Sequence, residues 1–160
     1  MDIPKLRIFA TVARLGNFTR AAELLYLTQP TVSQQLATLE AQIGAPLIER
    51  LPRRQRLTPA GEALLPYAEQ ILALADAAAE AARAAAFHVI DSTRVLSIAT
   101  NLGDTKSIVT HPATTSHGRL SEAQRQASGI GQGLIRLAVG LEHVDDITDD
   151  LQRGLGTLTT

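Results

Sequence analysis

Residues 18–36 read FTRAAELLYLTQPTVSQQL and predict the fold of the N-terminal part of the chain. The first part predicts a short helix that is capped by Thr19 and runs through Leu25, because a threonine side chain readily accepts a hydrogen bond at a helix N-terminus. Thr28 can cap a second helix in the same way. Pro30 would then lie in the first turn of that helix, where a missing N–H costs nothing.

These two helices form a helix-turn-helix pattern, joined by a turn of about three to four residues. Ala21 and Ala22 are small enough for the helices to cross closely, and Leu27 is expected to plug the turn. The outward face of the second helix carries polar side chains near its N-terminus, where they suit hydrogen bonding to base edges in a DNA groove. These side chains are Gln29, Thr31, Ser33 and Gln34. The helix N-terminus itself offers free N–H groups to a phosphate.

The flanking sequence completes a small domain. Residues 4–14 have apolar positions at helical spacing, and residues 47–58 alternate as a short β-hairpin does. The hairpin carries arginines that suit contact with DNA backbone or minor groove, namely Arg50, Arg53, Arg54 and Arg56. The alternative is a helical bundle with a solvated arginine loop. Together and in this order, the features favour DNA binding.

Thr58 is expected to cap a further helix that runs from Pro59 to about Ala86. Apolar side chains recur every seven residues along this helix, which is the spacing of a helix–helix seam. Pairing with a second copy is predicted through Leu64, Tyr67, Ile71, Leu74 and Ala78. The alternative is a long alanine-rich helix that packs on its own domain.

Beyond the long helix the pattern changes. Residues 95–99 and 134–139 are expected to be strands, whereas residues 101–118 are expected to be irregular because Gly, Thr, Pro and His dominate them. Ser121 is predicted to cap a short helix, and residues 144–155 to form a final helix with an acidic first turn. Two strands and two short helices give this segment only a small core.

Composition limits the function. The 160 residues carry a net charge of −1 at pH 7, but residues 1–60 hold eight Lys/Arg against four Asp/Glu, a net charge of +4. Residues 88–160 hold six against eight, a net charge of −2, together with all four histidines. The absence of cysteine excludes disulfides, thiolate metal sites and cysteine nucleophiles. With neither a signal peptide nor an apolar run of about 20 residues, a cytoplasmic location and no membrane partner are expected.

An ordered series of residues within positions 1–87 matches a known family. The series comprises Phe9, Val12, the runs 18–25 and 28–36, Leu39, Glu40, Ile43, Gly44, Leu47, Arg50 and the run 57–61. It resembles the N-terminal region of LysR-type transcriptional regulators. The resemblance implies a winged helix-turn-helix that reads an operator in double-stranded DNA as a homodimer, paired through the linker helix. It assigns the major groove to Gln29, Pro30, Thr31, Ser33 and Gln34, and the wing position to Arg53.

A second series lies within residues 84–160, which do not resemble the effector-binding domain that follows in LysR-type regulators. It comprises the runs 89–91, 101–107, 111–117, 129–130 and 133–142. These runs resemble the C-terminal end of the pyridoxal-phosphate enzymes of cysteine and methionine metabolism, in particular O-succinylhomoserine sulfhydrylases. The resemblance implies that Arg136 holds a substrate α-carboxylate and that Asn101 lines the same pocket.

Catalysis by this second segment is not expected. The reaction needs a Schiff-base lysine and a phosphate cradle, and neither Lys5 nor Lys106 stands in the family's Schiff-base context. We therefore expect no catalytic residue and no pyridoxal phosphate. His111 and His117 are too few for a metal site without a third ligand, so no metal is expected.

The predicted fold is mainly α: a winged helix-turn-helix and a long linker helix, followed by a small α+β fragment. The expected boundaries are 1–58 for the DNA-binding domain, 59–86 for the linker and dimerisation helix, and 87–160 for the enzyme-like segment. Sequence-specific DNA binding, with Thr28 and the four hairpin arginines among the contacts, is the first hypothesis for the function. The alternatives are an incomplete sulfhydrylase fragment fused to a DNA-binding head, or a recombined gene product whose tail has no role.

Overall fold

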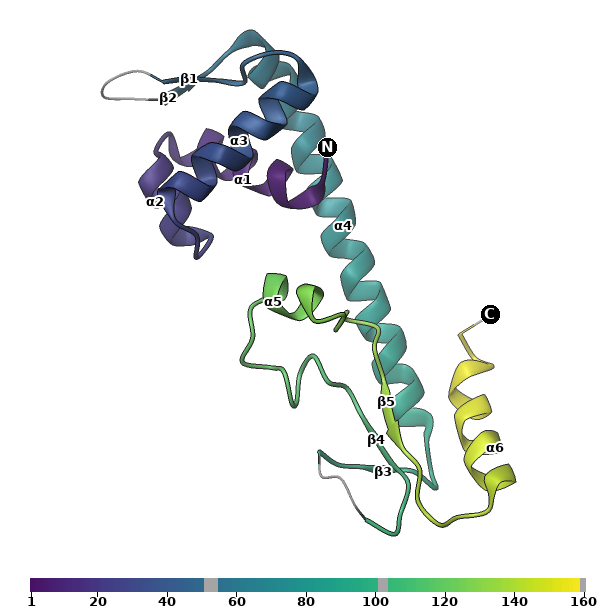
Figure 1. Ribbon diagram of the computed structural model, residues 1–160. Coiled ribbons are helices and arrows are strands. Elements are labelled where there is room, and N and C mark those ends of the chain that lie inside the picture. The colour runs from purple at the N-terminus through teal and green to yellow at the C-terminus, as the bar shows by residue number, and fades with distance from the viewer. Residues whose placement is uncertain (51–54, 101–103, 159–160) are drawn as a thin grey trace. The chain divides into compact units, whose positions relative to one another are not determined.

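The computed structural model describes residues 1–50, 55–100 and 104–158, and of Arg50 it describes the backbone alone. The chain divides into two compact units, Met1–Asp76 and Ala77–Thr160, and each is treated by itself. The elements of the first unit are α1 (Ile3–Leu15), α2 (Phe18–Leu24), α3 (Gln29–Ile43), β1 (Ile48–Arg50), β2 (Gln55–Leu57) and the first part of α4 (Pro59–Ser92) (Figure 1). Within the described residues, no helix combines the length and the apolar character that a membrane span requires.

The core of the first unit is built from the apolar faces of α1, α3 and α4. Phe9, Val32 and Leu36 are fully buried there, and Leu47 brings the start of the β-hairpin into the same cluster. Ala21 and Ala22 are buried as predicted, with exposures of 0% and 2%. These contacts fix the orientation of α3, because its apolar stripe can face the core in one way only.

Two local details differ from the expectation. The cap of α2 is Asn17 and not Thr19: Asn17 is extended, and its side chain accepts a hydrogen bond from the Arg20 N–H. Leu27 does not plug the turn, since it is 40% exposed, whereas Leu25 packs against the core. In both cases a neighbouring residue of similar chemistry takes the role, so the helix-turn-helix is preserved.

The second unit contains a three-stranded sheet of order β3 (Ser97–Ile98), β4 (Ile108–Thr110) and β5 (Arg136–Ala138), with α5 (Glu122–Ala127), α6 (Val144–Leu155) and the end of α4. Strands β3 and β4 are parallel, and β4 and β5 are antiparallel, with Val109 opposite Leu137. The small core joins Val109 to Ile90 of α4 and Ile147 of α6. The mainly α fold, with a small α+β segment at the C-terminal side, is thus confirmed.

Three expectations for this unit need correction. Strand β4 lies inside the stretch expected to be irregular, and its three residues are all buried. The two strands that were expected are shorter than predicted, at Ser97–Ile98 and Arg136–Ala138. Helix α4 continues past residue 86 to Ser92. It does so because Ile90, which is 2% exposed, supplies the α4 side of the small core.

Candidate nucleic-acid interface

Helix α3 has a firmly built N-terminus. Thr28 is extended, and its Oγ1 accepts a hydrogen bond from the Thr31 N–H at 3.3 Å. The Thr28 and Thr31 hydroxyls also contact each other at 2.8 Å. Pro30 lies in the first turn, as predicted, and Gly44 ends the helix in the left-handed conformation at φ 80°. A capped first turn holds the side chains beside it in a defined direction.

The polar face of α3 is directed to solvent. Gln29, Pro30 and Gln34 are exposed, and Thr31 and Ser33 are half-buried. Val32, Leu36 and Leu39 on the opposite face have no exposed surface. The Gln29 Nε2 donates to the Ser33 Oγ at 3.0 Å, so these two side chains are already oriented together.

The turn before α3 contains the single described non-glycine residue with a positive φ. Tyr26 has a φ of 56° and is 91% exposed. The following N–H, that of Leu27, donates to the Ala22 carbonyl at 2.9 Å and closes the turn against α2. This contact sets the angle at which α3 leaves α2.

The β-hairpin is anchored to α3 by the carboxylate of Glu40, for which the sequence predicted no structural role. The Glu40 Oε1 accepts from the N–H groups of Leu47 and Ile48, at 2.8 and 3.2 Å. At the other end of the hairpin, the Thr58 Oγ1 donates to the Pro46 carbonyl at 2.6 Å and accepts from the Gly61 N–H at 3.0 Å. A glutamate near the end of a helix and just before a strand is the signal that could have identified Glu40.

The basic hairpin is described only in part. Strands β1 and β2 are antiparallel, with Ile48 opposite Leu57, and Arg56 on β2 is exposed. Arg53 and Arg54 lie outside the described residues, as does the Arg50 side chain.

The predicted seam of α4 divides into two kinds of residue. Leu64 and Ile71 are half-buried and pack against the core of the first unit. Tyr67 and Leu74 are 64% and 73% exposed, and Ala78 is exposed as well. Packing on the chain's own domain therefore accounts for Leu64 and Ile71, and leaves the other three side chains open.

Comparison with known proteins identifies this arrangement. Residues 3–62 match the family described as bacterial regulatory helix-turn-helix protein, lysR family. The transcriptional regulator BudR of Klebsiella aerogenes is 42% identical over 132 residues, which cover 82% of this chain and 87% of BudR. The chain belongs to the LysR family. The solved structure titled as the CbnR_DBD–DNA complex is 42% identical and has a TM-score of 0.50, and the match covers 54% of this LysR-family chain and 99% of that one.

A second family covers the remainder of this LysR-family chain. Residues 68–156 match the Cys/Met metabolism PLP-dependent enzymes, so the chain belongs to that family as well. The O-succinylhomoserine sulfhydrylase of Pseudomonas aeruginosa is 60% identical over 76 residues, which cover 48% of this chain and 19% of the sulfhydrylase. The chain thus spans about a fifth of that relative's length and is a fusion of parts from two families.

Of the two residues predicted to contact a substrate carboxylate, the structure describes Arg136. Arg136 is half-buried on β5, and its Nη2 donates to the Thr100 carbonyl at 3.3 Å. Asn101, the other predicted carboxylate contact, lies outside the described residues.

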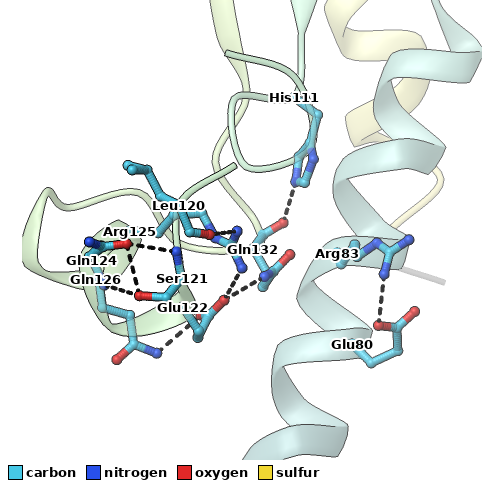
Figure 2. A network of polar contacts seen from close by, with 10 residues as sticks. All are labelled: Glu80, Arg83, His111, Leu120, Ser121, Glu122, Gln124, Arg125, Gln126 and Gln132. Atoms are coloured by element: carbon cyan, nitrogen blue, oxygen red, sulfur yellow. Dashed lines mark hydrogen bonds and ion pairs between the residues drawn. The ribbon is translucent and has the colours of Figure 1, made fainter. Parts of the chain in front are cut away.

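His111 is buried in the second unit, with 2% of its surface exposed. Its Nε2 lies 2.7 Å from the Gln132 carbonyl (Figure 2). Its ring lies against that of Phe87, with the ring centroids 4.9 Å apart and the planes tilted by 45°. Gln132 also donates to Glu122, whose pKa is held below its ordinary range mainly by the Arg125 guanidinium. Among the described residues, no group of three potential metal ligands is found.

The two lysines of the chain, Lys5 and Lys106, lie in different surroundings. A Schiff-base lysine is activated by removal from water or by a neighbouring cation. Lys106 is exposed, and the carboxylate of Asp104 accepts from its backbone N–H. Lys5 lies in α1 of the other unit and is paired with Asp2.

Proposed function

We propose that the chain binds double-stranded DNA sequence-specifically, as a transcriptional regulator of the LysR type, with α3 in the major groove. The observation that carries the proposal is the capped N-terminus of α3, which presents exposed amide and hydroxyl groups on a helix whose other face is locked into a core. A helix entering the major groove needs this combination, because base readout depends on side chains held in register. A related chain of known structure was solved with DNA, as its title states.

The individual contacts follow from side-chain chemistry. Glutamine amides can pair with adenine through two hydrogen bonds, so Gln29 and Gln34 are assigned to base edges. Thr28, Thr31 and Ser33 are assigned to base edges or phosphates beside them, and Pro30 to apolar contact. Arg56 is assigned to the DNA backbone, because guanidinium groups neutralise phosphates. By sequence alone, Arg50, Arg53 and Arg54 join it in the wing.

The same proposal includes a homodimer formed through α4. Tyr67 and Leu74 are large apolar side chains left in water along one helix, and such exposure costs free energy until a partner covers it. Leu64, Ile71 and Ala78 lie on the neighbouring line of α4, where Leu64 and Ile71 would add the surface that their own core leaves accessible. We retain residues 1–58 as the DNA-binding part, 59–86 as the dimerisation helix and 87–160 as the appended segment, and we place the protein in the cytoplasm with its DNA.

The DNA-binding test measures affinity by fluorescence anisotropy for a duplex selected from a random pool, with scrambled duplex as competitor. Gln34→Ala is expected to lose about 1–3 kcal/mol of preference at one base position. The matched control is Gln42→Ala, because Gln42 is an exposed glutamine at the far end of the same helix. Wild-type affinity should fall steeply with salt as counterions are released. Equal binding of selected and scrambled DNA by the wild type would refute the proposal.

The dimer is tested by sedimentation equilibrium of the full chain. Leu74→Glu is expected to shift the chain toward monomer, because it places a charge in the proposed seam. Leu155→Glu is the control, since Leu155 is 53% exposed on α6. A wild-type monomer at all accessible concentrations, or equal effects of the two substitutions, would contradict the seam.

We propose that residues 87–160 do not catalyse a pyridoxal-phosphate reaction on their own, since the chain spans 19% of the sulfhydrylase and its lysines do not fit the cofactor. Adding pyridoxal phosphate should give no stoichiometric Schiff-base absorbance band. A band that is lost in Lys106→Ala would overturn this conclusion and favour the enzyme hypothesis.

A further inference from the structure

Helices α1 and α4 are joined by two ion pairs within the first unit. The Arg7 Nη2 lies 2.7 Å from the Asp76 Oδ1, and the Arg14 Nη2 lies 3.6 Å from the Glu69 Oε1. The two arginines are seven residues apart on α1, and the two acids are seven residues apart on α4. The partners run in opposite order, so the two helices are antiparallel where they meet.

The ion pairs border a groove between the two helices. Its volume is about 480 Å³, and between the charged residues it is lined by Ala10, Thr11, Leu72 and Ala73. Ala10 and Leu72 are buried, at 4% and 9% exposure. Apolar packing thus holds the inner side of this helix pair, while the groove leaves the outer side without close packing. The two ion pairs link the helices along this groove.

The charges are sorted by helix, with the cations of these pairs on α1 and the anions on α4. A shift of one helix by a turn would move both guanidinium groups off their carboxylates at the same time. Charged pairs of this kind set the register and direction of helix pairs even where they add little stability. Their contribution to stability is small here, because the four side chains are between 44% and 75% exposed.

We propose that Arg7–Asp76 and Arg14–Glu69 are positioning pairs that set the angle between α4 and the DNA-reading head, residues 1–58. Through this angle they set the half-site spacing that the dimer accepts. This inference rests on the proposed function, since it requires a dimer through α4 and a recognition helix in each head. In such dimers the two recognition helices enter grooves about one helical turn, or a multiple of it, apart. A changed head angle therefore changes which spacing fits best.

The experiment uses the duplex selected by the wild-type chain and variants of it with one or two base pairs inserted or removed between the half-sites. The measured quantity is the ratio of the dissociation constants for altered and original spacing. Arg7→Asp and Asp76→Arg each place like charges together, and each is expected to reduce the ratio by up to about fivefold. The double variant R7D/D76R restores an ion pair with reversed sign and is expected to recover the ratio.

Asp145→Arg is the matched control, because the exposed Asp145 carboxylate contacts His143 in the second unit and lies outside both the DNA-binding part and the dimerisation helix. It should leave the ratio unchanged. The inference is overturned if the single variants keep the wild-type ratio, or if the double variant fails to recover it while thermal unfolding shows all chains folded. Failure of the proposed function looks different, since the wild type would then prefer no duplex at all.

Discussion

Substitution of Asp150 is expected to destabilise the second unit, because this carboxylate holds the backbone between α4 and β3 in place. Asp150 lies on α6 with no exposed surface. Its oxygens accept from the N–H groups of Arg94 at 2.8 and 3.0 Å, of Val95 at 2.8 Å and of Leu96 at 3.0 Å. The Arg153 guanidinium lies 3.7 Å away.

The magnitude follows from what Asp150→Ala leaves without a partner. The Leu96 N–H is buried, so losing its acceptor costs about 1–3 kcal/mol. The N–H groups of Arg94 and Val95 are partly buried and recover some of the loss by binding water. Their hydrogen bonds add about 0.5–1.5 kcal/mol each. The total, about 2–6 kcal/mol, is a large fraction of the free energy of unfolding of a small unit.

Hydrogen exchange measured by mass spectrometry is the suitable assay, because both tyrosines lie in the first unit and the chain has no tryptophan to report on the second. Asp150→Ala should speed exchange in residues 94–98 and 107–110 by at least about tenfold, as each 1.4 kcal/mol of lost opening free energy is a factor of ten. Asp150→Asn, which keeps an oxygen acceptor, should give a smaller effect. Asp149→Ala is the control, since Asp149 is the exposed neighbour on the same helix.

The same carboxylate predicts a pH dependence. Burial alone would raise the pKa of Asp150, but the N–H donors of Leu96, Arg94 and Val95 outweigh it and hold the pKa below its ordinary value of 3.8. A lowered pKa in the folded state means that the stabilisation is complete above pH 3.8 and is lost as the pH falls through the folded-state pKa.

The role of Asp150 in holding the second unit would be refuted by wild-type exchange rates in Asp150→Ala, or by equal effects of Asp149→Ala and Asp150→Ala.

Three further substitutions test other contacts. Gly61→Ala would place a Cβ 2.1 Å from the Leu47 carbonyl oxygen, so the free energy of unfolding of the first unit, measured by thermal unfolding, should fall by about 1–3 kcal/mol. Gly131→Ala is the control and should be neutral, because its Cβ would have nothing within 4 Å. Glu40→Ala leaves the N–H groups of Leu47 and Ile48 without their acceptor and should lower the free energy of unfolding by about 1–3 kcal/mol, measured with urea. Glu49→Ala is the control and should leave it unchanged, because Glu49 is exposed on the hairpin. The Ser107 N–H lowers the pKa of Glu142, and the Ser107 hydroxyl, which also donates to Glu142, adds to this effect. Ser107→Ala keeps the N–H and removes the hydroxyl, so it should raise the pKa of Glu142 part of the way toward its ordinary value in an NMR titration.

Much of the first unit could be predicted from sequence because its signals are local. Each of these signals acts on backbone groups within one helical turn of itself: the caps Thr28 and Thr58, the first-turn Pro30 and the terminal Gly44. What could not be predicted is which of two similar neighbours takes a role. Asn17 in place of Thr19, and Leu25 in place of Leu27, follow from the tertiary path of the chain.

The second unit was harder to predict because its strands are short and depend on partners distant in sequence. Ile108-Val109-Thr110 is β-branched throughout, which favours a strand, but the surrounding Gly, Pro and His residues concealed it. What makes these three residues a strand is their pairing with β3 and β5, which the local sequence does not show. Carboxylates such as Asp150 and Glu142 were likewise indistinguishable from solvated acids until the backbone groups that they bind were placed.

The junction between the two families falls inside α4, and helix physics explains why such a junction can fold. The LysR match ends at residue 62 and the enzyme match begins at residue 68, while the helix runs unbroken from Pro59 to Ser92. Helical hydrogen bonds link residues four apart, so continuity requires a helical backbone across the join, and α4 keeps one there although Pro66 lies within it. The alanine-rich stretch after Asp76, made of good helix formers, then continues the helix. Each end of the helix then needs an apolar face suited to its own unit. Leu72 serves the first core and Ile90 the second, and neither contact depends on the other. A fusion at a loop would have required new turn chemistry, whereas a fusion within a helix required only that both apolar stripes continue.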